Sequence, residues 1–210
     1  MAMSPSDHEC TLALAALGKR MPSVGETQYR CPPEEPNLMS VVIYVEIGEI
    51  SMLLGADLEQ HADGRRGWAA VLSDTTLPKA KSIVFKIPHH GSETTFSPDV
   101  WNELLAKSPL AVTTPWVRGN RRLPSASDIG RLVARTPHGF ISSMPIVGQS
   151  TVTRPAMVER QLREMGVRIN RMEPQMGAVQ FRNDGTSDWS RWTVTLHEAA
   201  RPLTLADAAA

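Results

Sequence analysis

The clearest pattern along this chain is a series of short apolar runs, rich in β-branched residues, that alternate with segments of helical spacing. Residues 40–46 and 49–55 are two such runs, and they predict a β-hairpin whose second strand is apolar on both faces. Residues 81–87 and 110–114 predict two further buried strands. The order strand, helix, strand, helix, strand is typical of a layered α/β sheet.

Other segments show apolar residues at helical spacing or a second alternating pattern. In the second half, an Asn-Asp-Gly turn signal at 183–185 predicts a hairpin between two alternating runs. The expected helices are 6–18, 67–72, 99–105, a segment capped by Ser127 or Asp128 and ending at Ala134, and 156–165 between Pro155 and Gly166; the expected later strands are 139–143, 177–182 and 191–197.

This pattern divides the 210 residues into three parts. We expect the main α/β unit over 1–150, a continuation with a helix and a terminal β-hairpin over 151–200, and a frayed, flexible tail over 201–210. Residues 18–37 carry several prolines and glycines, which predicts a surface loop between the first helix and the sheet. A chain of this length can bury a real core.

Composition narrows the classes of function. The chain has 22 basic and 22 acidic residues, so its net charge does not favour nucleic acid, a membrane surface or an acidic ligand. Two cysteines, Cys10 and Cys31, form neither a disulfide scaffold nor a C-x-x-C pair, which favours a reducing compartment. No apolar run approaches the ~20 residues of a membrane span, and no signal-peptide pattern opens the chain. We therefore expect a cytoplasmic protein with no membrane partner.

Asp57 is the first candidate for chemistry, because it directly follows the apolar run that ends in Leu53-Leu54-Gly55. An ionised carboxylate at the end of a buried strand needs a cation or hydrogen-bond donors nearby. Two interpretations stay open from the residues alone. Asp57 either binds a metal ion or caps the segment that follows it.

The second candidate is the segment Pro88-His89-His90-Gly91-Ser92, which ends the next apolar strand. Neutral imidazole is a good zinc ligand, and glycine lets the backbone pass close to a ligand. In an extended segment neighbouring side chains point to opposite sides, so one histidine would ligate while the other packs, hydrogen-bonds or acts as an acid. The alternative is that both are ordinary turn residues.

Four motifs in one order carry a resemblance to a known family. They are Asn37-Leu38-Met39-Ser40-Val41-Val42, Leu53-Leu54-Gly55-Ala56-Asp57-Leu58-Glu59, Ile87-Pro88-His89-His90-Gly91-Ser92, and Asn120 ahead of Pro124. Together they are similar to the C-terminal half of metallo-β-lactamase-fold hydrolases of the ComEC-like, DNA-uptake-associated type. The resemblance implies a partial αββα sandwich, with a mixed sheet and flanking helices.

The resemblance also implies roles for individual residues. Asp57 would be the bridging metal ligand, and His89, in preference to His90, the terminal ligand of a site for two divalent metals, most naturally zinc. His90 and Ser92 would be catalytic and would contact the substrate, and Asn120 would bind it. The implied activity is hydrolysis of a phosphodiester or another ester.

The chain also departs from the family pattern. It contains no His-x-His-x-Asp-His motif, and Leu123 stands where many relatives have a histidine. Asp57 and one histidine are fewer ligands than the three plus water of a catalytic zinc site.

These departures leave several hypotheses open. A hydrolase would need its missing half from a second polypeptide or through a homo-oligomer; otherwise the chain is a fragment or a non-catalytic regulatory half-domain that pairs with another chain. Nucleic acid enters as a partner only through the family resemblance. In an unrelated α/β domain, Asp57 and His89 would be capping and turn residues.

Overall fold

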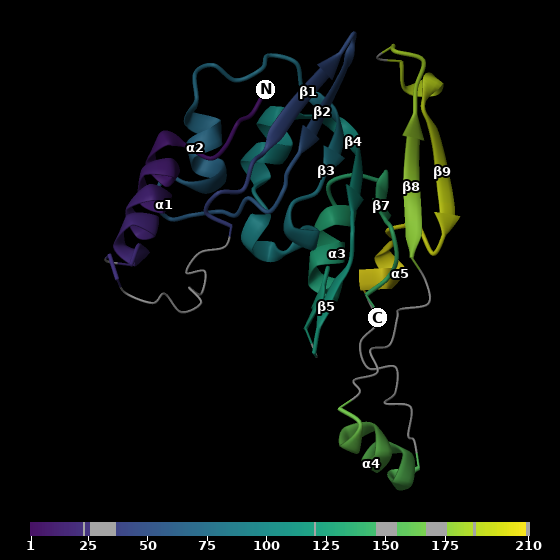
Figure 1. Ribbon diagram of the computed structural model, residues 1–210. Helices are drawn as coiled ribbons and strands as arrows, with labels where there is room; N and C mark the ends of the chain where they lie inside the picture. Colours follow the sequence, from purple (N-terminus) through teal and green to yellow (C-terminus); the bar gives the residue numbers. More distant parts are fainter. Residues whose placement is uncertain are drawn as a thin grey trace.

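A six-stranded mixed sheet forms the centre of the computed structural model, which describes residues 1–22, 24–25, 37–119, 121–145, 155–166, 176–186 and 188–208 (Figure 1). The strand order is β1-β2-β3-β4-β7-β10. The four inner strands run parallel, and the two edge strands are antiparallel to their neighbours. The strands are β1 (Ile43–Ile47), β2 (Ile50–Leu54), β3 (Ser82–Lys86), β4 (Leu105–Thr113), β7 (Gly139–Ile141) and β10 (Arg201–Pro202). The predicted mixed α/β sheet with flanking helices is confirmed.

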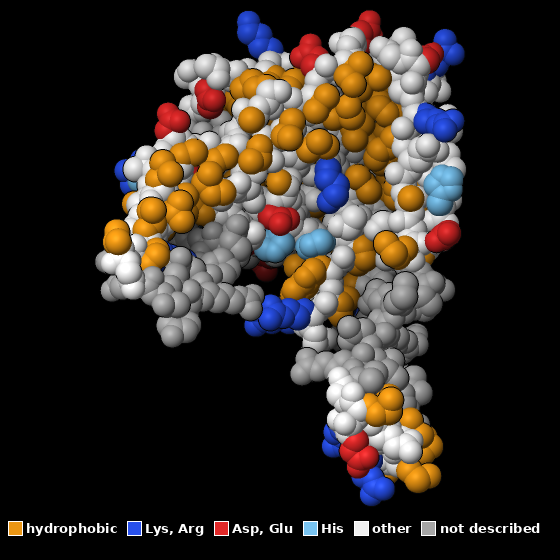
Figure 2. All heavy atoms as spheres, in the orientation of Figure 1, with side chains coloured by type: hydrophobic (Ala, Val, Ile, Leu, Met, Phe, Trp, Pro, Cys, Tyr) orange, Lys and Arg blue, Asp and Glu red, His pale blue; other side chains and the backbone are white. Residues whose placement is uncertain are grey.

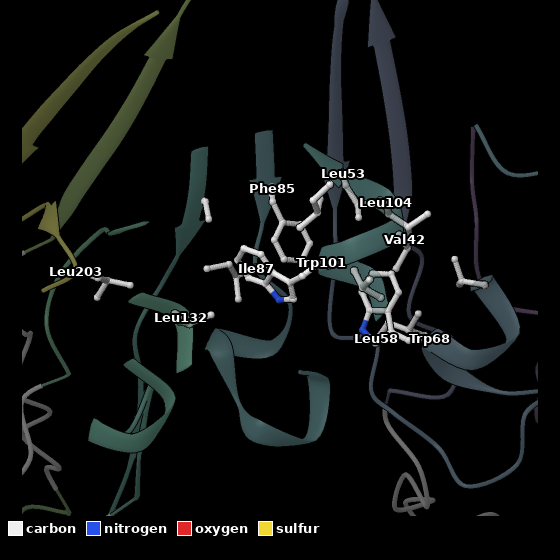
Figure 3. Packing of buried hydrophobic residues seen from close by; sticks show 14 of the residues in the cluster. Val42, Leu53, Leu58, Trp68, Phe85, Ile87, Trp101, Leu104, Leu132 and Leu203 are labelled. Atoms are coloured by element: carbon white, nitrogen blue, oxygen red, sulfur yellow. The ribbon is translucent and has the colours of Figure 1, made fainter. Parts of the chain in front are cut away.

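The helices α2 (Gly67–Ser73) and α3 (Ala126–Val133) and a π-helical turn, η3 (Val100–Leu104), supply the side chains that cover one face of this sheet. Alternate strand residues point toward them and form the core, in which Phe85 of β3 meets the Trp101 indole edge-on at 5.3 Å (Figure 3). Burial of these large side chains from both layers is the main stabilising contribution in the domain. The predicted helix at 67–72 is confirmed as α2, whereas the helix predicted at 99–105 is only the π-helical turn η3, because Leu105 already begins β4.

The opposite face of the sheet is also apolar. The register places Val45, Met52, Val84 and Leu110 in one row across β1 to β4. A hairpin of β8 (Gly177–Arg182) and β9 (Thr193–Glu198) covers part of this face, where Phe181 contacts Phe140 at 5.7 Å between ring centroids. The hairpin leaves Ile43, Ile47 and Leu54 exposed by 38%, 60% and 37%. We call these three residues, with Val45 and Met52, the open apolar face.

The N-terminal helix α1 (Asp7–Arg20) begins with a capping box in which Ser6 and Glu9 exchange hydrogen bonds. Glu9 is buried and accepts a hydrogen bond from the backbone of Gly67, which ties α1 to the start of α2. Among the described residues, none of the helices is long and apolar enough to span a membrane.

The cap of α3 differs from the prediction. Ser125, and neither Ser127 nor Asp128, is the N-cap, and Asp128 instead occupies the third helical position of a capping box with Ser125. Three polar residues in four positions compete for this role, and only the position of the helix on the sheet selects one of them.

The second half of the chain adds smaller elements to the sheet. None of the described residues of α4 (Ala156–Glu164) is buried, and the helix contributes no side chain to the core. The remaining elements are β5 (Trp116–Arg118), β6 (Arg121–Leu123), the short 3-10 turns η1 (His89–Gly91), η2 (Glu93–Thr95) and η4 (Trp189–Arg191), and α5 (Leu205–Ala208).

The C-terminus differs from the frayed tail expected over 201–210, because residues 201–208 belong to the fold. β10 pairs with β7, α5 packs against α3, and Leu203 is only 5% exposed. Asp207 caps this turn by accepting hydrogen bonds from the backbone N–H and the hydroxyl of Thr204, and it pairs with Arg201. A short alanine-rich sequence is thus ordered by one buried leucine and one capping carboxylate.

Candidate functional site

The carboxyl ends of β2, β3 and β4 meet at one edge of the sheet. Because these strands are parallel, Asp57, His89 and Thr114, which follow them, lie at the same edge. This edge is where open α/β sheets commonly bind ligands. The parallel pairing thus brings Asp57 and His89, which each follow an apolar strand in the sequence, to one edge.

Gly55 allows the ends of β2 and β3 to approach closely. Its backbone N–H donates to the Lys86 carbonyl at 3.0 Å, and a Cβ added at this position would lie 2.9 Å from that same oxygen and from Pro88 Cδ. The His89 backbone N–H then donates to the Ala56 carbonyl at 2.9 Å. Two backbone hydrogen bonds therefore join the loop that carries Asp57 to the loop that carries His89.

Left-handed backbone is concentrated in these two loops. Ala56, His89 and His90 have φ angles of 47°, 42° and 58°. Such conformations cost about 1–3 kcal/mol each for residues other than glycine and persist where surrounding contacts impose them. The expectation of an extended segment with histidines on opposite sides is therefore wrong, since His89 to Gly91 form one tight turn.

The imidazole of His89 is oriented by a carboxylate. Its Nδ1 lies 3.1 Å from Oε1 of Glu59 and 3.5 Å from Nδ2 of Asn37. The shorter contact, to a carboxylate, decides the tautomer, so Nδ1 carries the proton and donates it to Glu59. Thr94 fixes the same carboxylate oxygen by donating its hydroxyl at 2.9 Å. In the neutral form of this imidazole, Nε2 carries the lone pair, as in carboxylate-histidine pairs that bind metals.

His90 is held by different partners. Its Nδ1 lies 3.0 Å from the Thr114 carbonyl and 3.1 Å from the Thr114 hydroxyl, and its ring stacks on Trp116 at 6.5 Å. The carbonyl can only accept, so Nδ1 of His90 also donates. The two imidazole centroids lie 6.1 Å apart, with their planes at 59° to one another.

Asp57 is exposed, and Lys86 stands nearby. Burial lowers the pKa of Lys86, and the Asp57 carboxylate opposes part of that shift. Figure 2 shows histidine side chains with acidic and basic side chains beside them, below a broad gathering of hydrophobic side chains. The edge that carries Asp57 and His89 adjoins the open apolar face, since Leu54 of that face ends β2 and Asp57 follows three residues later.

The remaining two candidates are Ser92 and Asn120. Ser92 caps the next turn, since its hydroxyl accepts from the Thr94 backbone N–H at 3.4 Å and lies 3.2 Å from the Thr94 hydroxyl. Asn120, expected to bind substrate, lies outside the described residues.

The described residues alone do not fit a closed zinc site. They contain no group of three or more histidine, cysteine, aspartate or glutamate side chains placed to hold a metal ion. The histidine orientation is of the kind that metals use, but a tetrahedral zinc needs more ligands than Asp57 and His89. The arrangement is an open edge with two candidate ligands.

Sequence reasoning missed the residues that hold the two histidines. Glu59 is the most important, and its sequence signal was its place two positions after Asp57, on the same loop. Thr94, Thr114 and Lys86 carried no distinctive signal. Each of them reaches the site only through the pairing of strands or the packing of a turn.

No protein-family model, curated protein or solved structure significantly matches this chain.

Proposed function

We propose that this chain is one half of a metal-dependent hydrolase of the metallo-β-lactamase type, and that a second polypeptide carrying the His-x-His-x-Asp-His half completes it. The proposal rests on one observation: the edge that carries Asp57 and His89 lies next to the open apolar face. The substrate class implied by the resemblance is a phosphodiester or another ester.

The first support is the state of the candidate ligands. Glu59, itself held by Thr94, orients the imidazole of His89 through Nδ1, so that Nε2 would be the atom that binds a metal. Backbone hydrogen bonds bring its loop against the loop of Asp57. Metal ligands need side chains that are held in place by hydrogen-bonded neighbours, and His89 has this support.

The second support is the open apolar face. Ile43 and its cross-strand partner Leu54, together with Ile47 further along β1, are exposed on the face of the sheet opposite the helices. Contiguous exposed apolar surface is uncommon on proteins that act alone and marks interaction sites. In a partial αββα sandwich, this face is where the second sheet would pack, and the ligands of that second sheet would then approach Asp57 and His89.

Metal binding by the purified chain tests the proposed ligands. Zinc affinity, measured by competition with a chromophoric chelator and by elemental analysis, should be weak and substoichiometric. It should fall further in the double variant Asp57→Ala, His89→Ala and stay unchanged in His197→Ala, which removes an exposed histidine from β9. Equal zinc binding by the double variant and the wild type would refute the ligand assignment.

Activity tests the need for a second half. The chain alone should not hydrolyse bis(p-nitrophenyl) phosphate with zinc or manganese present. Hydrolysis should appear when a polypeptide with the His-x-His-x-Asp-His half is added, and Asp57→Ala should abolish it. Activity of the isolated chain would disprove the split arrangement.

A non-catalytic regulatory half-domain is the second candidate function, and the open apolar face favours it equally. The two candidates differ in one result. A regulatory subunit would bind its partner and change the partner's activity to the same extent with and without Asp57 and His89.

A further inference from the structure

A second hollow lies at the opposite edge of the sheet, where β3 and β4 begin. It measures about 360 Å³ and is lined by residues that include Lys81, Asn102, Lys107, Ser108 and Arg135. It shares no residue with the edge that carries Asp57 and His89. We call it the bulge pocket.

The bulge pocket exists because β4 carries extra residues. Ser82 pairs with Leu105, and Val84 pairs with Leu110, so two steps along β3 correspond to five along β4. Residues 106–109 stand opposite the single residue 83, so β4 has three extra residues that bulge out of the ladder, and Ser108 takes a left-handed φ of 57°. Bulges of this kind redirect side chains and are common next to functional sites.

The charges around the bulge pocket are all of one sign. Lys81, Lys107 and Arg135 come from three different segments, and no acidic side chain is among the described residues that line the pocket. In a chain with a formal net charge of zero, such a grouping creates a local positive potential without a counter-charge at the pocket.

Two of these cations are positioned by Asn102. Lys81 Nζ donates to the Asn102 carbonyl at 2.5 Å, and an Arg135 guanidinium N–H donates to Asn102 Oδ1 at 3.4 Å. The Arg135 guanidinium also lies 5.4 Å from the centre of the Phe96 ring, which restricts its orientation. Lys107, in the bulge, has no hydrogen bond or ion pair with any described residue and is free to meet a ligand.

We propose that the bulge pocket binds the phosphate group of a small molecule. Lys81 and Arg135 form two sides of the site, and Lys107 closes over the bound anion from the bulge. Ammonium and guanidinium groups make their strongest hydrogen bonds to phosphate oxygens, and the hollow has the size of a small-ligand pocket. This proposal is independent of the hydrolase proposal, since it uses none of the same residues.

Isothermal titration of the full chain with inorganic pyrophosphate tests the site. We expect saturable binding of one pyrophosphate per chain, with affinity that falls as salt rises. Lys107→Gln should weaken the affinity at least about tenfold, since one charge-assisted hydrogen bond is lost. Lys107 is exposed, so the variant should fold normally. Lys19→Gln, which removes an exposed charge from the end of α1, is the matched control and should change the affinity less than about twofold.

Amide NMR shifts locate the bound ion. In the wild type, the largest shifts should fall on residues 106–108 and on Arg135. Equal weakening by Lys107→Gln and Lys19→Gln would mean general charge attraction and would overturn the site. Absence of saturable pyrophosphate binding would overturn it too, as would binding of a single-stranded oligonucleotide without any binding of pyrophosphate.

Discussion

Replacement of Leu203 by alanine should destabilise the whole domain, although this residue lies only seven positions before the last residue, Ala210. Leu203 is 5% exposed and belongs to the same buried cluster as Leu132 and Ile141. The substitution removes three buried carbons at about 0.8 kcal/mol each, or about 2.4 kcal/mol. The cavity left behind adds to this, so we expect a loss of about 3 kcal/mol in the free energy of unfolding.

The matched control lies two residues further on. Leu205 starts α5 and is 70% exposed, so Leu205→Ala should change the free energy of unfolding by less than about 0.5 kcal/mol. Urea denaturation followed by circular dichroism measures both variants, and the slope of the transition should be the same as in the wild type. If the two variants differ by less than about 1 kcal/mol, the C-terminal segment is not part of the cooperative core.

Three further predictions concern the candidate site and its supports. Glu59→Gln should weaken any zinc binding through His89 about tenfold or more and shift the imidazole ¹⁵N resonances away from the Nδ1-protonated tautomer; unchanged resonances would exclude the positioning role. Lys86→Met should raise stability at neutral pH, because burial lowers the pKa of Lys86 and the folded chain carries this charge at a cost. In the wild type, the free energy of unfolding should therefore rise with pH between the lowered pKa and the ordinary lysine value, and urea denaturation across that range should show no such rise in the variant. Gly67→Ala should cost more than about 2 kcal/mol, because the φ angle is +60° and the new Cβ would lie 2.1 Å from the Glu59 carbonyl oxygen, whereas Gly64→Ala, with open space around it, should be nearly neutral in thermal melts.

The open apolar face is the surface on which the proposed partner would pack. A sheet covered by helices on one side and by a single hairpin on the other leaves Ile43, Ile47 and Leu54 in contact with water. A partner that covers them would lie beside the Asp57 and His89 edge. In the proposed split hydrolase, binding of the partner chain would also complete the metal site.

The apolar runs that form β1, β2, β3, β7 and the second half of β4 were predictable from the sequence, whereas β5, β6 and β10 were not. Apolar runs such as 49–55 and 81–87 can be buried on both faces only as inner strands, and parallel pairing then places the residues that follow them at one edge. The predicted strand at 110–114 was too short, because β4 starts at Leu105 and includes a polar bulge that hides the pattern. Residues in a bulge do not alternate between the two faces of the sheet, so their sequence shows no strand pattern.

The sequence by itself determined the mixed α/β class and the placement of Asp57 and His89 directly after two apolar strands, because burial and strand period are local properties of short segments. Only the tertiary structure decided which carboxylate orients His89, which serine caps α3 and whether residues 201–208 belong to the fold. Each of these depends on one contact between residues far apart in the chain or on a choice among equivalent local partners. Local patterns cannot rank such alternatives, since their energies differ only after the layers have packed.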